Sequence, residues 1–460
     1  MRMPFVRLTV SWLLFGSAIV AGLTFSSGPS DAGASGKSCH VALRPSVDLA
    51  GCNLSGRNLA GADLVRANLS GANLKGTNLE NARLTSALLT GANLSLTDLS
   101  NTRLNGAVLS GVVSGSVAGT PLLPAHWSLT SGYLVGPGAN LTGARLSGSN
   151  LTGADLLAAR LTRANLSNVS SGSIVGIPVL PAHWRLVNGY LVGPSADLAS
   201  ANLKGANLSL ADITGANLTG ALLEGANLPG ANLSKAVLTG SNLSGTRMNG
   251  ATLSGVVSGS VTGVPLLPTG WIMAAGFMVG PDANLAQANL SNTDLSNTDL
   301  QGTILTGANL SGVTSGSITG SPTLPENWSV VLGYLVGPYA DLSNANLAGG
   351  GFFNHDLDNA NLSNADLASA YFFDASLANA NLAGTNLDDA SFAAASLTGA
   401  NLTDAALTNV SFVDAGLTGT NMTGANLTGA QFTGVDTSTA VTTNSTICSD
   451  GIVGPCTNWQ

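Results

Sequence analysis

Charged residues are scarce in this chain of 460 residues: 16 Lys and Arg and 24 Asp and Glu make up 9% of it and give a formal net charge of −8. An ordinary globular domain has about 25% charged residues. The few cations and the acidic balance disfavour a protein that binds nucleic acid through its phosphates. Intrinsic disorder is also disfavoured, because 44% of the residues are hydrophobic and the net charge is small.

Histidine is rarer still, with four in the whole chain. Two of them, His126 and His183, stand in a repeated Ala-His-Trp segment whose other two copies have Gly270 and Asn327 at that position. The sequence has no Gly-x-Ser-x-Gly elbow, no phosphate-binding loop and no His-Glu-x-x-His motif. We therefore expect a protein that is not an enzyme and has no catalytic, cofactor-binding or metal-binding residues.

The four cysteines form two local pairs near the ends of the chain, Cys39 with Cys52 and Cys448 with Cys456. A zinc site made from all four would require the two ends to meet, and the spacings are not the short C-x₂₋₄-C kind. We expect a disulfide within each pair, as is usual in an exported protein.

Residues 1–34 have the pattern of a secretory signal peptide, with Arg2 and Arg7 ahead of an uncharged apolar run from Leu8 to Phe25. The run also just reaches the length of a membrane-spanning helix, so an uncleaved anchor is the alternative and would be the one contact with a membrane. In both cases the rest of the chain is expected to be secreted or to lie on the extracellular side of the cell envelope.

A large apolar residue recurs at every fifth position between Leu49 and Phe432, in 56 units that hold 48 Leu, five Phe, two Met and one Ile. The residue before it is mostly Asn or Asp, and the one before that is mostly Ala. On a helix this period would spread the apolar residues around all sides, and on a flat strand it would expose half of them. A chain that turns a corner every five residues brings each of them inside, which predicts an all-β solenoid.

The spacing of phenylalanines predicts the number of sides in each coil. In the last block of repeats, a Phe takes the place of the central Leu in every fourth unit. In a four-sided coil these rings would stack in successive coils, whereas a three-sided coil would disperse them. We expect a core stack of Phe352, Phe372, Phe392, Phe412 and Phe432.

The units resemble those of the pentapeptide-repeat proteins, whose consensus A(D/N)LXX matches the segments AGADL, SGANL and TGANL. The resemblance implies a right-handed quadrilateral (four-sided) β-helix over most of residues 48–434. Because open solenoid ends would pair with one another, we assign residues 35–47 to an N-terminal cap and residues 435–460 to a C-terminal cap, each held by its disulfide.

Two functions are consistent with that resemblance. Some pentapeptide-repeat proteins mimic DNA and bind type II topoisomerases such as gyrase, which protects these enzymes from quinolones. Here Asn outnumbers Asp on the outer positions, and export would separate the protein from gyrase. We therefore expect a non-enzymatic, exported scaffold that binds an unknown protein or cell-envelope partner and no nucleic acid, with the DNA-mimicking topoisomerase-binding protein as the alternative.

Four inserts of equal length and common sequence interrupt the period, within residues 110–137, 167–194, 254–281 and 311–338. Each has Ser-Gly-Ser, Pro-x-Leu-Pro, a Trp, a Tyr or Phe at the sixth position after that Trp, and Val-Gly-Pro, and is expected to form a short β-hairpin projecting from or lying along the solenoid. Each aromatic pair has two candidate roles, as a brace against the solenoid or as an interaction patch for a glycan or a protein. The pairs are Trp127 and Tyr133, Trp184 and Tyr190, Trp271 and Phe277, and Trp328 and Tyr334.

Overall fold

The computed structural model describes residues 39–457 and residue 459. The signal peptide or anchor expected at residues 1–34 lies outside the described residues, as does the start of the N-terminal cap. No segment within residues 39–457 is helical, so none forms a helix that could span a membrane. Contacts divide the chain into two compact units, of which the first ends at Leu141 and the second begins at Thr142.

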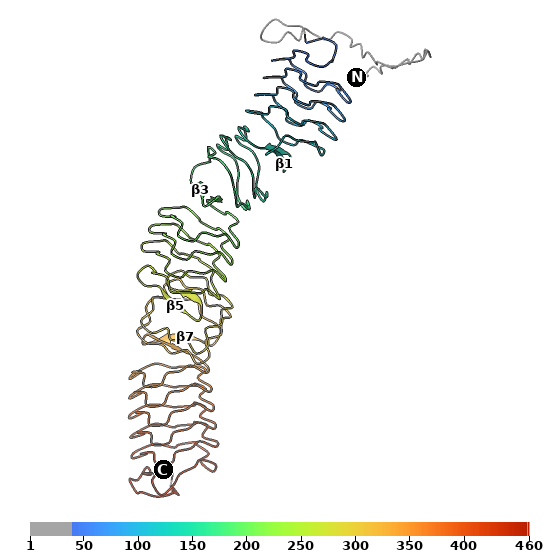
Figure 1. The fold of residues 1–460 in the computed structure, drawn as a ribbon. Coiled ribbons are helices and arrows are strands. Elements are labelled where there is room, and N and C mark those ends of the chain that lie inside the picture. The colour runs from blue at the N-terminus through green and yellow to red at the C-terminus, as the bar shows by residue number, and fades with distance from the viewer. Residues whose placement is uncertain (1–38, 458, 460) are drawn as a thin grey trace, which may run out of the picture. The chain divides into compact units, whose positions relative to one another are not determined.

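Parallel β-bridges join equivalent positions of every fourth unit along the repeats. Asn53 pairs with Asn73, for example, and Asn361 pairs with Asn381. The bridging residue is the one just before the central apolar residue of each unit. Backbone pairing therefore recurs at the same interval that separates the phenylalanines, and the chain of residues 341–436 is seen as a stack of coils (Figure 1).

The interior of the coils is formed by the central apolar residues. All 56 are buried, and none is more than 6% exposed. Ala or Thr two positions earlier is buried beside them, and a buried Thr hydroxyl donates to a carbonyl of the preceding coil, as Thr77 does to Leu54 O (3.0 Å). Among the described residues no buried side-chain nitrogen or oxygen lacks a hydrogen-bond partner. The prediction that the apolar residues point inward is confirmed.

Each unit ends in a β-turn that makes the corner. The amide of Cys52 donates to the carbonyl of Leu49 (3.1 Å), and the intervening Gly51 has a φ of +68°. A positive φ at the third residue is what a type II turn requires, and Gly adopts it without strain. This conformation accounts for the frequent Gly two positions after each central residue.

Asn before the central residue has two roles that follow from its amide. Its oxygen accepts the backbone N–H of the second residue after it, as Asn381 Oδ1 does from Ala383 (3.3 Å), which shapes the corner. Its Nδ2 donates to the side chain one coil earlier, from Asn361 to Asp341 (3.0 Å) and from Asn381 to Asn361 (3.1 Å). Neutral Asn thus forms ladders between coils without the repulsion that a column of Asp would produce.

Each insert contains one antiparallel hairpin of two short strands. In every hairpin all residues of one strand pair with those of the other, so that Ser128 lies opposite Val135 and Ile272 opposite Val279. The strands are β1 (Ser128–Thr130) with β2 (Tyr133–Val135), β3 (Arg185–Val187) with β4 (Tyr190–Val192), β5 (Ile272–Ala274) with β6 (Phe277–Val279), and β7 (Ser329–Val331) with β8 (Tyr334–Val336).

The hairpins are parts of coils, which differs from the expectation that they project from the solenoid or lie along it. In the third insert Thr262 and Leu266 still bridge to the preceding coil, the hairpin β5–β6 follows, and the chain then returns to pair Asn284 with Val257. A coil that holds a hairpin is therefore longer than a regular coil. The five-residue period is interrupted there, but the stacking of coils continues.

The second strand of a hairpin also divides the hydrophobic interior. In β6, Met278 packs into the core cluster of residues 192–278, and the next residue, Val279, packs into the cluster that runs to residue 335. In β8, Leu335 and Val336 separate the next two clusters in the same way. Because successive strand residues face opposite sides, a hairpin closes one core segment and opens the next.

The five phenylalanines of the last block lie in one column, with ring centroids 4.7, 4.6, 5.5 and 5.2 Å apart and nearly parallel planes. The indole of Trp459 meets the last ring, Phe432, edge-on at 5.0 Å. This indole covers the end of the column and shields it from solvent.

Both cysteine pairs form disulfides, Cys39–Cys52 at the beginning of the described chain and Cys448–Cys456 near its end. Residues beyond the last repeat continue the pairing, because Val441 and Ile447 bridge to the preceding coil. The segment after the last repeat therefore stacks on the final coils, and the assignment of the two caps stays a prediction.

Burial predicts the stability of two leucine variants from the same stretch of repeats. Leu223 is fully buried, whereas Leu210 is 74% exposed. Leu223→Ala should lower the free energy of unfolding by about 2–5 kcal/mol because it leaves a cavity, and Leu210→Ala should change it by less than about 0.5 kcal/mol. Urea denaturation of both variants measures this; similar losses would contradict the inward assignment.

Candidate functional site

The four Trp residues of the inserts lie flat against a glycine across the hairpin. A Cβ placed on Gly193 would come within 2.3 Å of the indole of Trp184. Only Gly leaves room for the ring there, which explains the Gly of the Val-Gly-Pro motif. The same contact occurs in the other inserts, between Trp127 and Gly136, Trp271 and Gly280, and Trp328 and Gly337.

The second aromatic residue of each insert packs on the Gly of Ser-Gly-Ser. A Cβ on Gly172 would lie 3.1 Å from the ring of Tyr190. The Tyr190 hydroxyl accepts a hydrogen bond from the amide of Asn202 (3.1 Å), and the first serine of the motif, Ser171, accepts one from Leu191 in β4 (2.9 Å). The residues that the four inserts share are therefore those whose contacts hold each hairpin in its coil.

These contacts support the bracing role of the aromatic pairs. All eight rings are partly buried, and the four Trp residues pack against the core clusters. The alternative role, as an interaction patch, stays a prediction.

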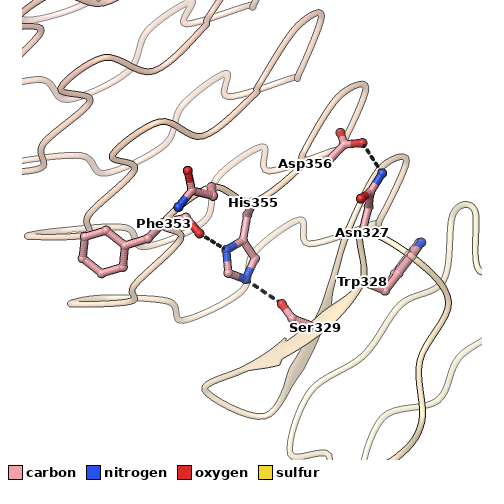
Figure 2. A pocket seen from close by; sticks show the side chains of 7 residues that line it. Asn327, Trp328, Ser329, Phe353, His355 and Asp356 are labelled. Atoms are coloured by element: carbon pink, nitrogen blue, oxygen red, sulfur yellow. Dashed lines mark hydrogen bonds between the residues drawn. The ribbon is translucent and has the colours of Figure 1, made fainter.

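A small pocket of about 210 Å³ lies where the fourth hairpin meets the following coil (Figure 2). Its residues are Asn327, Trp328 and Ser329 from the hairpin and the segment 353–356 from the coil. Sites for drug-sized ligands are larger, about 300–1,000 Å³. The pocket is therefore of a size for a single side chain.

His355 joins the two walls of this pocket. Its Nε2 lies 2.7 Å from Ser329 Oγ, and its Nδ1 lies 3.0 Å from the carbonyl oxygen of Phe353 (Figure 2). In the neutral imidazole, a proton on Nδ1 is donated to that carbonyl, and Nε2 accepts a hydrogen bond from the serine hydroxyl. A serine nucleophile needs a base in this position but also donors for an oxyanion, which this contact does not supply. It does hold the hairpin to the coil, together with the bond from Asn327 Nδ2 to Asp356 Oδ2 (3.2 Å).

Phe353, which lines this pocket, belongs to a set of exposed aromatic residues that are close in the sequence. Among the described residues, four aromatic side chains are more than a third exposed, and all lie between residues 339 and 373: Tyr339, Phe353, Tyr371 and Phe373. The rings of Phe353 and Tyr371 are 6.2 Å apart and nearly parallel, at 13°. The amide of Asn354 donates to the carbonyl of Phe373 (3.0 Å), so Phe353 and Phe373 occupy the same corner of adjacent coils.

Charge is divided unevenly along the chain, a feature that the reasoning from whole-chain composition missed. Residues 1–247 carry 16 Lys and Arg and 9 Asp and Glu, a net of +7. Residues 248–460 carry 15 Asp and Glu and no Lys or Arg, a net of −15. Counting the charges of each half separately would have revealed this, because the whole-chain value of −8 averages the two.

Two carboxylates of the acidic half, residues 248–460, have a lowered pKa. Hydrogen bonds from the hydroxyl and the amide of Ser296 hold the pKa of Asp294 below its ordinary value, and Ser438 lowers the pKa of Asp436 in the same way. The acidic side chains are also dispersed: within the described part of the chain, no three His, Cys, Asp or Glu side chains gather as metal ligands would.

A family model described as pentapeptide repeats matches the chain in eight copies, at residues 48–85, 77–113, 138–170, 195–228, 216–255, 282–314, 375–414 and 400–436. Together these copies cover more than half of the chain. No curated protein matches it.

Several solved structures of pentapeptide repeat proteins are similar to the chain. HetL from Nostoc, described as involved in heterocyst differentiation regulation, is 21% identical over 89% of this chain and 92% of its own, with a TM-score of 0.14. A protein of the Arabidopsis thaliana thylakoid lumen is 37% identical over 21% of this chain and 67% of its own, with a TM-score of 0.14. QnrB1, a plasmid-mediated fluoroquinolone resistance protein, is 16% identical over 51% of this chain and 92% of its own, with a TM-score of 0.13.

A double-mutant cycle tests the contact between the Trp184 ring and Gly193. Gly193→Ala should destabilise the protein by about 1–3 kcal/mol, because the new methyl group overlaps the indole of Trp184. In a Trp184→Ala background the same change should cost much less, since the overlapping ring is gone. Unfolding free energies of the four proteins measure the coupling. Equal costs of Gly193→Ala in both backgrounds would contradict the bracing contact.

Proposed function

The chain belongs to the pentapeptide-repeat family, and from this premise we propose that it is an exported, non-enzymatic scaffold that binds a protein or a cell-envelope partner. Its coils form a right-handed, four-sided β-helix in this proposal. We expect the partner to bind the outer surface of the coils. The aromatic pairs of the inserts, the candidate interaction patch, also expose part of their rings on this surface.

The observation that carries the proposal is the pair of disulfides. Cys39–Cys52 and Cys448–Cys456 join residues at both ends of the repeats. Disulfides persist in oxidising compartments and are rare where glutathione and thioredoxin keep thiols reduced. Their presence supports a location outside the reducing cytoplasm, as does the signal-peptide pattern of residues 1–34.

The construction of the coils supports a scaffold role. The large side chains of the repeat are used for the interior, and backbone and Asn hydrogen bonds join each coil to the next. A surface held in this way loses little conformational freedom when a partner binds, which favours affinity. Extended surfaces of this type are what repeat proteins use for binding.

The acidic half favours the alternative, a DNA mimic, only weakly. The 15 carboxylates of residues 248–460 correspond to about 1.4 per four-unit coil. DNA carries one charge per about 1.7 Å, or about 2.8 over the 4.8 Å or so between stacked strands. The charge density is thus about half that of DNA, and we retain the scaffold as the proposed function.

The location is tested with the full chain expressed behind its own N-terminus in a bacterial host. We expect the protein outside the cytoplasm, with all four cysteines resistant to alkylation until a reductant is added. A variant that lacks residues 1–34 should stay in the cytoplasm and is the control. Recovery of the full-length chain from the cytoplasm with four reactive thiols would overturn the export proposal.

The DNA-mimic alternative is tested with purified gyrase. We expect the oxidised protein neither to inhibit DNA supercoiling nor to protect the enzyme from a quinolone, because its charge density is too low to compete with DNA. A known topoisomerase-protecting pentapeptide protein serves as the positive control. Protection at comparable concentrations would favour the alternative over the scaffold.

A further inference from the structure

We propose that the exposed aromatic surface formed by Phe353, Tyr371 and Phe373, here called the aromatic corner, binds an arginine-bearing segment of a partner protein. The proposal deepens the scaffold function, on which it rests for the existence of a partner. It names the place of binding and the chemistry of the ligand.

The aromatic corner is an uncommon feature on this surface. Its three side chains are 54%, 51% and 48% exposed, while the corresponding corner residues of the next coils are Ala393 and Val413. Apart from Tyr339, the other exposed large apolar side chains of the described repeats are aliphatic, such as Leu157 and Leu210, and a repeat corner needs no aromatic side chain. Exposed apolar clusters of this kind indicate interaction sites.

The chemistry around the corner selects a cation. Asp374 follows Phe373 directly, Asp356 lines the pocket beside Phe353, and no Lys or Arg occurs anywhere in residues 248–460. The face of an aromatic ring attracts a cation, and nearby carboxylates strengthen that attraction. Anionic ligands such as nucleic acid are repelled by the same field.

Arginine fits the geometry better than lysine. The rings of Phe353 and Tyr371 are stacked with nearly parallel planes, and an exposed ring face is a surface on which a planar guanidinium can stack. A carboxylate at the edge of that surface can accept the fork of N–H donors. The adjoining pocket of about 210 Å³ has room for one further side chain of the same segment.

The ligand is assigned to a different protein, although the basic half of a second copy has the complementary charge. Several cations of the basic half are already engaged: Arg83 with Asp63 (3.2 Å), Lys204 with Glu224 (2.9 Å), and Arg185 with two backbone carbonyls. A partner segment with unpaired arginines would not have to break these contacts.

Binding is tested by calorimetry on the purified, oxidised full chain with three short Gly/Ser peptides, which carry arginines, lysines or glutamates. We expect saturable binding of the arginine peptide, weaker binding of the lysine peptide and none of the glutamate peptide, with affinity falling as salt is raised. Phe353→Ala and Tyr371→Ala should each raise the Kd about tenfold. Leu210→Ala, which removes an exposed apolar side chain from the basic half, should leave the Kd unchanged.

A matched pair of charge variants separates a local site from the general acidic field. Asp356→Asn with Asp374→Asn should raise the Kd about tenfold, because the changes remove both charges at the site, while the Asn oxygen at position 356 can still accept the corner N–H of Asp358. Asp366→Asn with Asp404→Asn removes two charges from equivalent repeat positions on other walls and should change the Kd less than about twofold.

Four results would overturn the proposal: no saturable binding of the arginine peptide, equal losses for both charge pairs, displacement of the peptide by a neutral oligosaccharide, or a dimer that Tyr371→Ala dissociates. Each can occur whether or not the protein is exported, so failure of this site is distinguishable from failure of the proposed location. Thermal unfolding of every variant confirms that a lost affinity is not a lost fold.

Discussion

The parallel backbone pairing of each unit with the fourth unit after it is the constraint on which the rest of the structure depends. It requires a corner in every unit, which accounts for the positive φ values and the frequent Gly. It also brings equivalent side chains of successive coils into register. The apolar interior, the Asn ladders and the stack of phenylalanines are all consequences of that register.

The inserts show how strictly this pairing is kept. Each departs from the five-residue period, yet the chain returns to pair with its own preceding coil. The hairpin is accommodated because a glycine admits the Trp ring and a second glycine admits the Tyr or Phe ring. The extra residues of each insert are thereby contained within one coil, and the hairpin divides the hydrophobic interior into segments.

Much of the fold could be predicted from the sequence, and the candidate site could not. The period of five requires buried central residues, and the interval between Phe352 and Phe372 indicated the pairing interval. The contact between His355 and Ser329 joins residues 26 positions apart, and only the path of the fourth insert brings them together. The excess of carboxylates in residues 248–460 is present in the sequence, but the net charge of the whole chain conceals it. The 16 cations of residues 1–247 offset those carboxylates in the sum.

The sequence by itself determined the repeat, its inward face and the pairing of cysteines, because a short period imposes the same local geometry on every unit. The tertiary structure decided what lies between units: that hairpins belong to coils, that the Trp rings are seated on glycines, and that Phe353, Tyr371 and Phe373 share one exposed corner. Such contacts depend on which residues the stacking of coils brings side by side. That depends on the number of residues in each coil, which changes wherever an insert occurs.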